Sequence, residues 1–243
     1  MSLAVISLPA FAAELKVLTA GAYKPIAVAM MPAFERQTGH TLKIENDTAG
    51  ALERRITQGE SFDVVIMPPA GLERLAQSGR VVADSQARLA RVAIGVAVKR
   101  GAPVPDISTV AAFRQALVAA RAIAYIDPAA GGSSGIYLSQ LFQRWDMAAQ
   151  LAPKSVLVPG GLVAERLVTG EADLAIHQIS EILAVPGAVL VGPIPAEIQN
   201  FTVYSGAVGA AASEPAAARA LLTILGGTGA QDVLADKGME SAP

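Results

Sequence analysis

Short runs of aliphatic and β-branched residues alternate with longer helical stretches along almost the whole chain. Apolar runs of this length, bounded by glycine, proline and small polar residues, are typical of strands. The predicted strands are 15–19, 41–45, 62–67, 91–98, 122–126, 155–158, 172–177 and 201–208, and the predicted helices are 25–38, 50–58, 71–77, 110–119, 134–145, 161–169, 216–225 and 231–243. This βαβα alternation predicts an α/β fold with mixed, mostly parallel sheets and helices on both faces.

Proline and glycine mark where the predicted helices begin and end. Pro25 suits the first turn of a helix, because its missing N–H has no partner there. Gly39 and Gly170 follow predicted helices and favour the left-handed conformation that ends them. Pro32 lies inside the first predicted helix, where we expect a kink or a short break.

Composition favours a folded globular chain and argues against several kinds of partner. Apolar residues make up 52% of the 243 residues, charged residues 16%, and the net charge is −2, which favours a compact core over disorder. Basic and acidic residues are interspersed and only 5% of residues are aromatic, so nucleic-acid binding is not expected. With no cysteine and only His40 and His177, neither a metal site nor a cofactor is expected.

The first thirteen residues are apolar and end in Ala10-Phe11-Ala12 before Ala13. This small-x-small pattern is typical of a signal-peptidase site, so residues 1–12 are interpreted as a signal-peptide remnant and the protein is expected in the periplasm. The alternative is a disordered apolar terminus. No apolar run reaches the roughly 20 residues that a membrane-spanning helix needs.

Two proline-punctuated zones, 96–106 and 186–196, are the only candidate boundaries within the chain. A segment enclosed by two such zones, with flanking pieces that pair together, predicts two lobes joined by two strands. No internal repeat is present in the sequence.

Three motifs in order carry a resemblance to a known family. They are PAFERQTGHTLKI at 32–44, QGESFDVVI at 58–66 and VTGEADLAI at 168–176. From about residue 13 to its end, the chain resembles the type II periplasmic solute-binding proteins. It is most similar to the molybdate-binding branch of the substrate-binding proteins that serve ABC transporters.

The resemblance implies a two-lobe fold with two hinge crossings and a small anion held in the cleft. Lobe I would comprise residues 13–90 plus 200–243, and lobe II residues 91–199. The resemblance also implies that the protein is a monomer and that its partner is the membrane permease of an ABC importer.

Loops that follow strands supply the candidate ligand-binding residues, because the crevice of an open α/β sheet lies at the carboxyl ends of its strands. Backbone amides at helix starts, hydroxyl groups and a cation are groups that hold anions. The candidates are Ala20, Gly21, Ala22, Tyr23, Lys24, Thr48, Ala49, Gly132, Ser133, Ser134, His177 and Gln178, with Met67 as an apolar wall.

Each of these candidates also has a purely structural interpretation. The first loop is alternatively a tight turn with Lys24 in solvent, and Ser133 or Ser134 is alternatively a helix cap without a ligand. A lone histidine such as His177 is often structural.

Departures from the molybdate-binding pattern bear on the ligand. Those relatives typically hold their oxyanion with serine hydroxyls in the first two loops and a tyrosine after the late strand. Here the corresponding positions are Gly21-Ala22, Thr48-Ala49 and His177-Gln178. An organic carboxylate therefore suits the loops at least as well as an oxyanion does.

Two hypotheses of function follow. The first is a periplasmic binding protein that captures a small anion for an ABC importer. The second is an isomerase on the same fold acting on a tricarboxylate such as aconitate, because periplasmic aconitate isomerase resembles this family. A 1,3-proton shift needs only a base, an acid and carboxylate anchors, and the candidates for proton transfer are His177, Lys24, Tyr23 and Glu181. An effector-sensing domain of a transcription factor shares the fold, but it would need an attached helix-turn-helix.

Overall fold

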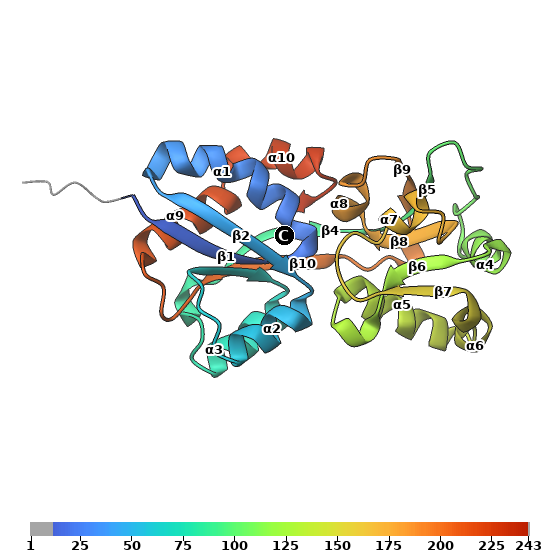
Figure 1. Ribbon diagram of the computed structural model, residues 1–243, viewed down its shortest axis with the longest axis horizontal. Coiled ribbons are helices and arrows are strands. Elements are labelled where there is room, and N and C mark those ends of the chain that lie inside the picture. Colours follow the sequence, from blue (N-terminus) through green and yellow to red (C-terminus); the bar gives the residue numbers. More distant parts are fainter. Residues whose placement is uncertain (1–11, 243) are drawn as a thin grey trace, which may run out of the picture.

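The computed structural model describes residues 12–242 and contains two β-sheets, each flanked by helices (Figure 1). The predicted signal-peptide remnant lies, except for Ala12, outside the described residues. Within the described chain, no helix has the length and apolar character required to cross a bilayer.

The six-stranded sheet has the strand order β11-β4-β10-β3-β1-β2. Its elements come from both ends of the described chain. They are β1 (Glu14–Ala20), α1 (Lys24–Thr38), β2 (Thr41–Asp47), α2 (Ala49–Thr57), β3 (Val64–Met67), α3 (Pro69–Gln77), β4 (Ala87–Val92), β10 (Thr202–Val208), α9 (Pro215–Gly226), α10 (Gln231–Asp236) and β11 (Glu240–Ser241).

The five-stranded sheet has the order β7-β6-β8-β5-β9 and is built from the middle of the chain. Its elements are β5 (Ile94–Lys99), α4 (Val110–Ala119), β6 (Ile123–Ile126), α5 (Ser133–Arg144), α6 (Ala148–Leu151), β7 (Ser155–Val158), α7 (Glu165–Val168), β8 (Leu174–Gln178), α8 (Ile179–Leu183) and β9 (Ala188–Pro193).

Both sheets are mixed, as the sequence predicts, but parallel pairs do not dominate. β1 pairs in parallel with β2 and β3, and β6 pairs in parallel with β7 and β8. The pairs made by β4, β5, β9, β10 and β11 are antiparallel. The difference from the expectation arises because the strands that carry the chain between the sheets run against their neighbours.

Strand alternation explains how helices cover both faces of a sheet. In β1, Val17 belongs to a buried cluster with residues of α1 and α9, whereas the next residue, Leu18, belongs to a cluster with residues of α2 and α3. Successive side chains of a strand point to opposite faces, so one apolar strand supplies both cores. Figure 1 shows α1 and α9 on one side of this sheet and α2 and α3 on the other.

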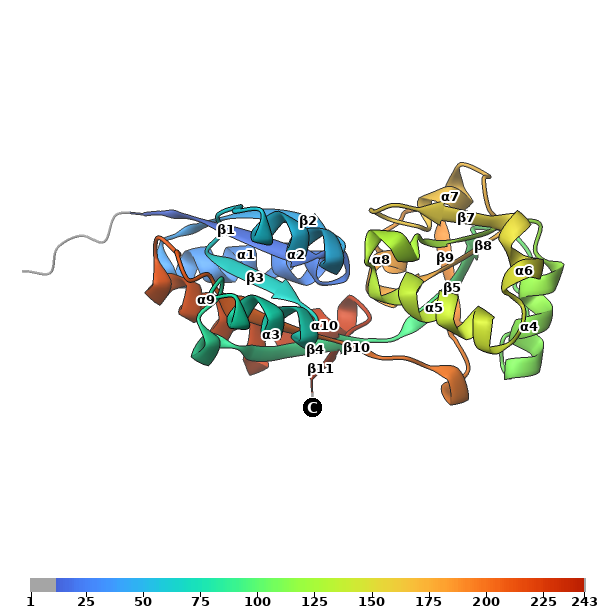
Figure 2. The same ribbon diagram turned by 90° about the horizontal axis from the view of Figure 1, so that it is seen from below.

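The chain passes between the sheets twice. The first crossing is the single residue Ala93 between β4 and β5, and the second is the segment between β9 and β10. The side chain of Gln199 joins the crossings: its Oε1 accepts a hydrogen bond from the N–H of Ile94 at 2.9 Å, and its Nε2 donates to the carbonyl of Ile94 at 2.9 Å. The two connections therefore run side by side (Figure 2). We propose that these connections join lobe I (13–90 plus 200–243) and lobe II (91–199), with the first predicted boundary moved to Ala93 because β4 extends to Val92.

Several predicted elements differ in extent. The predicted strand 91–98 is β4 and β5 in two different sheets, and the predicted helix 161–169 contains only the one-turn α7. The predicted C-terminal helix stops at Asp236 and is followed by β11. α1 is not broken at Pro32, which is exposed, so water replaces the backbone hydrogen bond that proline cannot make. Gly39 ends α1 with φ 74°, as predicted.

Candidate functional site

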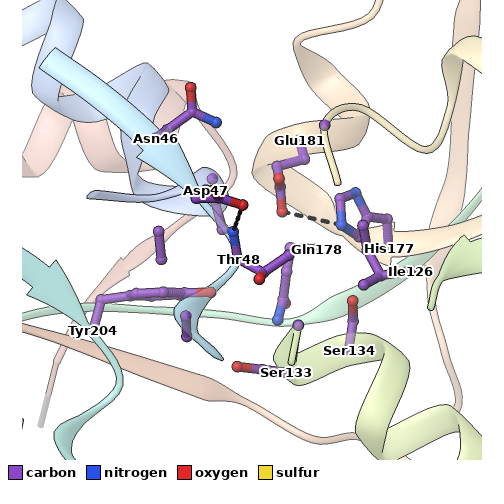
Figure 3. A pocket seen from close by; sticks show the side chains of 16 residues that line it. Asn46, Asp47, Thr48, Ile126, Ser133, Ser134, His177, Gln178, Glu181 and Tyr204 are labelled. Carbon is purple, nitrogen blue, oxygen red and sulfur yellow. Dashed lines mark hydrogen bonds and ion pairs between the residues drawn. The ribbon is translucent and has the colours of Figure 1, made fainter. Parts of the chain in front are cut away.

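A pocket lies between the two sheets, and we call it the cleft pocket (Figure 3). Ten residues singled out from the sequence line it, namely Ala20, Gly21, Ala22, Thr48, Ala49, Gly132, Ser133, Ser134, His177 and Gln178. Glu181, which the sequence also indicated for proton transfer, lines it as well, as do Asn46, Asp47, Ile126, Gly161 and Tyr204. The loops after β1, β2, β6 and β8 therefore converge at one place.

Three of the sequence candidates lie outside the cleft pocket. Tyr23 is fully buried, with its ring centroid 6.4 Å from that of Tyr204. Lys24 is exposed at the first position of α1, and Met67 is buried in the core cluster that also contains Leu18. Both Tyr23 and Lys24 were predicted to line the crevice because they closely follow β1. The 3₁₀ turn after β1 instead places them away from the cleft pocket.

Helix starts and not cations face the cleft pocket. α2 begins at Ala49 and α5 at Ser133, and a 3₁₀ turn at Gly21–Tyr23 leads into α1. The amide groups of a helix's first turn carry partial positive charge and bind anions. None of the lysine and arginine side chains within 12–242 lines the pocket. Backbone dipoles and hydroxyl groups would therefore hold an anion here.

The start of α5 leaves serine hydroxyls free of a capping role. Gly132 is the N-cap residue of α5, and no side chain caps this helix. Ser133 and Ser134 occupy the first turn and line the cleft pocket. The capping alternative for these serines does not apply in this structure.

Thr48 has a different role from the ligand donor that the sequence indicated. Its Oγ1 donates a hydrogen bond to the carbonyl of Ala130 at 2.5 Å and accepts one from the N–H of Ala51 at 3.1 Å. The N–H of Gly50 also donates to the carbonyl of Gly131 at 3.1 Å. The Thr48 hydroxyl thus caps α2 and joins the two sides of the pocket at its edge.

A buried pair of titratable groups, His177 and Glu181, lies on one side of the cleft pocket. The turn from β8 into α8 places Nε2 of His177 3.2 Å from Oε2 of Glu181, as Figure 3 shows. His177 is 2% and Glu181 7% exposed. Nδ1 of His177 is buried without a hydrogen-bond partner.

Burial sets the protonation of this pair. Loss of hydration lowers the pKa of His177 to about 3 and raises the pKa of Glu181 to about 8. Both shifts favour the uncharged groups, a neutral imidazole and a protonated carboxyl, with one proton in the hydrogen bond between them. A neutral acid beside three helix starts does not repel an anionic ligand.

Two more polar side chains complete this side of the pocket. Tyr204, from the middle of β10, directs its hydroxyl into the pocket, and burial raises its pKa. The phenol therefore remains protonated and available as a donor. Gln178 donates from Nε2 to Oγ1 of Thr202 at 2.8 Å, while its buried Oε1 lacks a partner.

Some of the pocket residues that sequence analysis missed could have been predicted from the sequence, and others could not. Asn46 and Asp47 are the last two residues of β2, directly before the predicted candidate Thr48, so a rule that searches strand ends could have found them. Tyr204 lies in mid-strand, and a strand-end rule does not find such a residue. Metal binding has no cluster to support it: within residues 12–242, His, Asp and Glu side chains do not gather in groups of three or more suited to an ion.

Comparison with known proteins shows which family this chain resembles over its length. Residues 15–240 match the family model described as bacterial extracellular solute-binding protein. The chain is similar to an aconitate isomerase from Pseudomonas sp, with 38% identity over 252 residues that cover 100% of this chain and 95% of that protein.

Solved structures agree on the fold. The periplasmic molybdate-binding protein of Azotobacter vinelandii superposes with a TM-score of 0.79 at 20% identity, covering 94% of this chain and 100% of that one. The sulfate-binding protein SubI from Mycobacterium tuberculosis H37Rv gives 0.76 at 16% identity, covering 95% and 87%. The chain belongs to the bacterial extracellular solute-binding protein family and has the type II, molybdate-binding-like fold that its motifs indicated.

Proposed function

We propose that this protein is a periplasmic isomerase that binds a small tricarboxylate such as aconitate in the cleft pocket and catalyses a 1,3-proton shift. The observation that carries the proposal is the buried His177–Glu181 pair, which lines a pocket that the starts of α2 and α5 and two serine hydroxyls also face. Similarity over the full chain to an aconitate isomerase supports the same reaction.

The chemistry requires one proton to leave a methylene carbon and one to arrive at the vinylic carbon two atoms away. In our proposal the Glu181 proton first moves to Nε2 of His177, which leaves a Glu181 carboxylate. That carboxylate takes the methylene proton, and the electron pair spreads over the allylic carbons and the adjoining carboxylate. Glu181 then returns the proton to the other carbon, and the double bond has moved.

Charge is conserved at every step of this sequence. The positive charge of the imidazolium accompanies the negative charge that develops on the substrate. That negative charge disappears when Glu181 returns the proton to carbon, and the Nε2 proton of His177 then moves back to the Glu181 carboxylate to restore the neutral pair. A buried site strengthens this pairing because little water screens it. The amide groups at the starts of α2 and α5 and the hydroxyls of Ser133 and Ser134 would anchor the carboxylates.

The test uses cis- and trans-aconitate separately, followed by proton NMR in H2O and D2O. We expect interconversion by the wild-type protein. Because Glu181 returns the proton that it removed, less than one deuterium per turnover should enter the methylene group in D2O. Glu181→Gln and His177→Asn should lower kcat by at least about 100-fold, the usual contribution of a general acid or base. Glu197→Gln is the matched control, because Glu197 is exposed and does not line the pocket.

The second candidate function is a binding protein that passes a small organic carboxylate or oxyanion to the membrane permease of an ABC importer. The family and the fold favour it, as do the hydrogen bonds from Thr48 and Gly50 that hold the cleft pocket closed. Calorimetry separates the two functions: tight binding of aconitate without any interconversion supports transport and rejects catalysis. In either case we propose a monomer in the periplasm, which cell fractionation and light scattering would check.

A further inference from the structure

Gly21 lies directly against the carboxyl group of Glu181. A Cβ atom built on Gly21 would overlap with Oε1 of Glu181 and would lie 3.4 Å from its Cδ and 3.8 Å from Nδ2 of Asn46. The φ of Gly21 is not in the left-handed region, so its backbone suits any residue. Space for the carboxyl, and not backbone conformation, is what glycine provides at this position.

The two residues come from opposite sides of the cleft pocket. Gly21 follows β1 of the six-stranded sheet, whereas Glu181 belongs to α8 beside the five-stranded sheet. Their neighbours bind each other, because Oγ of Ser180 donates a hydrogen bond to the carbonyl of Ala22 at 2.8 Å, and Ser180 is 1% exposed. This buried bond fixes α8 against the turn and holds the Glu181 carboxyl over Gly21.

The position of the carboxyl is therefore set from three directions. His177 contacts it at 3.2 Å from β8, Tyr204 faces it from β10, and Gly21 closes the side toward β1. A side chain at position 21 would push Oε1 away, and little free space surrounds a residue that is 7% exposed. The displacement would act on the hydrogen bond to His177.

We infer that Gly21 is a positioning residue for the His177–Glu181 pair, and that the absence of a side chain there determines whether the pocket moves a proton or only binds its ligand. The inference rests on the proposed function for its catalytic part. Its geometric part, the coupling of position 21 to His177 through Glu181, stands without that function.

The first test compares Gly21→Ala with the wild type. Because the displaced atom is the end of a side chain, we expect a folded protein that still binds aconitate within a few-fold of wild type while kcat falls by about 100-fold or more. Gly229→Ala is the matched control, since nothing lies within 4 Å of a Cβ added there, and it should behave like the wild type. A fall in kcat/KM caused entirely by weaker binding would overturn the inference, because position 21 would then only shape the pocket.

The second test does not depend on activity. The chain has only two histidines, so the ring nitrogen resonances of His177 can be separated from those of His40 by comparison with His177→Asn. Gly21→Ala should shift the His177 ring signals and leave those of His40 in place, whereas Gly229→Ala should move neither. Unchanged His177 signals in Gly21→Ala would contradict the coupling, whatever the wild type does to aconitate. A wild type without isomerase activity would reject the proposed function alone.

A double-mutant cycle tests the same contact through stability. In a Glu181→Ala background no carboxyl remains to collide with a methyl group at position 21. Gly21→Ala should therefore lower the unfolding temperature in the wild-type background and leave it nearly unchanged in the Glu181→Ala background. Equal effects in both backgrounds would show that Gly21 and Glu181 do not interact.

Discussion

Replacing Glu181 with glutamine should change how the stability of the folded protein depends on pH. Burial raises the pKa of this carboxyl from 4.5 to about 8. Between these two values the folded protein keeps a proton that the unfolded chain has lost, so the free energy of unfolding falls as pH rises. The slope for one such group is about 1.4 kcal/mol per pH unit. A glutamine of the same size has no proton to lose and removes this slope.

From about pH 5.5 to about pH 7.5, Glu181→Gln should therefore gain about 3 kcal/mol in stability relative to the wild type. The assay is urea unfolding followed by the fluorescence of Trp145, the only tryptophan, which ends α5 in the same half of the molecule. His177 is present in both proteins, so its own titration largely cancels in the comparison. Glu197→Gln, at an exposed position outside the cleft pocket, is the matched control.

One result would refute this reasoning. A difference between Glu181→Gln and wild type that stays constant from about pH 5.5 to about pH 7.5 would mean that the folded protein does not retain the Glu181 proton in this range, as when the carboxylate forms an ion pair with a charged His177. That outcome removes the protonated Glu181 from which the proposed proton shift starts.

Two further substitutions test the closed cleft and the core. Gly50→Ala would place a methyl group 2.9 Å from Cα of Gly131, and neither backbone can yield while the cleft is closed. Aconitate affinity, measured by calorimetry, should therefore fall by about tenfold, or roughly 1.4 kcal/mol. An unchanged affinity would contradict the contact, and Gly229→Ala is the control. The buried carboxylate of Asp63 accepts bonds from the N–H of Lys16 and from the N–H and hydroxyl of Ser213 at 2.7–2.9 Å. Asp63→Asn should lower the free energy of unfolding by about 2 kcal/mol in thermal or urea unfolding, and a loss below the error of that measurement would be inconsistent with this role.

Local sequence patterns predicted most elements because their causes are local. Helix α4 begins after the Thr109 cap, whose hydroxyl accepts from the N–H of Ala112, and α1 ends at Gly39. The division of 91–98 into two strands has no such cause. Every residue of that run suits a strand, and only long-range pairing decides that the chain leaves one sheet at Ala93 and enters the other.

The strand β9 was not predicted, because its composition resembles that of a loop. Its proline and glycine content favoured a connection between elements, yet Ala188–Pro193 forms a strand at the edge of the five-stranded sheet. An edge strand leaves one row of backbone groups unpaired, so Pro193 at its end and Gly192, with φ 158°, are tolerated there. Composition alone does not distinguish such an edge from a loop.

Residues of the candidate site also differ in whether local sequence rules could predict them. Residues at the ends of parallel strands, such as His177 and Ser133, were found because the fold class fixes where strand ends meet. Tyr204 was missed because it reaches the pocket from mid-strand, where the β10–β4 register shifts between Tyr204 and Ser205. Lys24 was proposed from its charge, but a helix start carries it to the surface.

The side chain of Gln199 has a mechanical consequence. Gln199 lies in the second connection and bonds the N–H and the carbonyl of Ile94, which directly follows the first connection. These bonds hold the two connections next to each other. Because the two connections lie beside each other, the halves of the molecule can bend about one line that passes through both. Such bending would open the cleft pocket and expose His177 and Glu181 to water together.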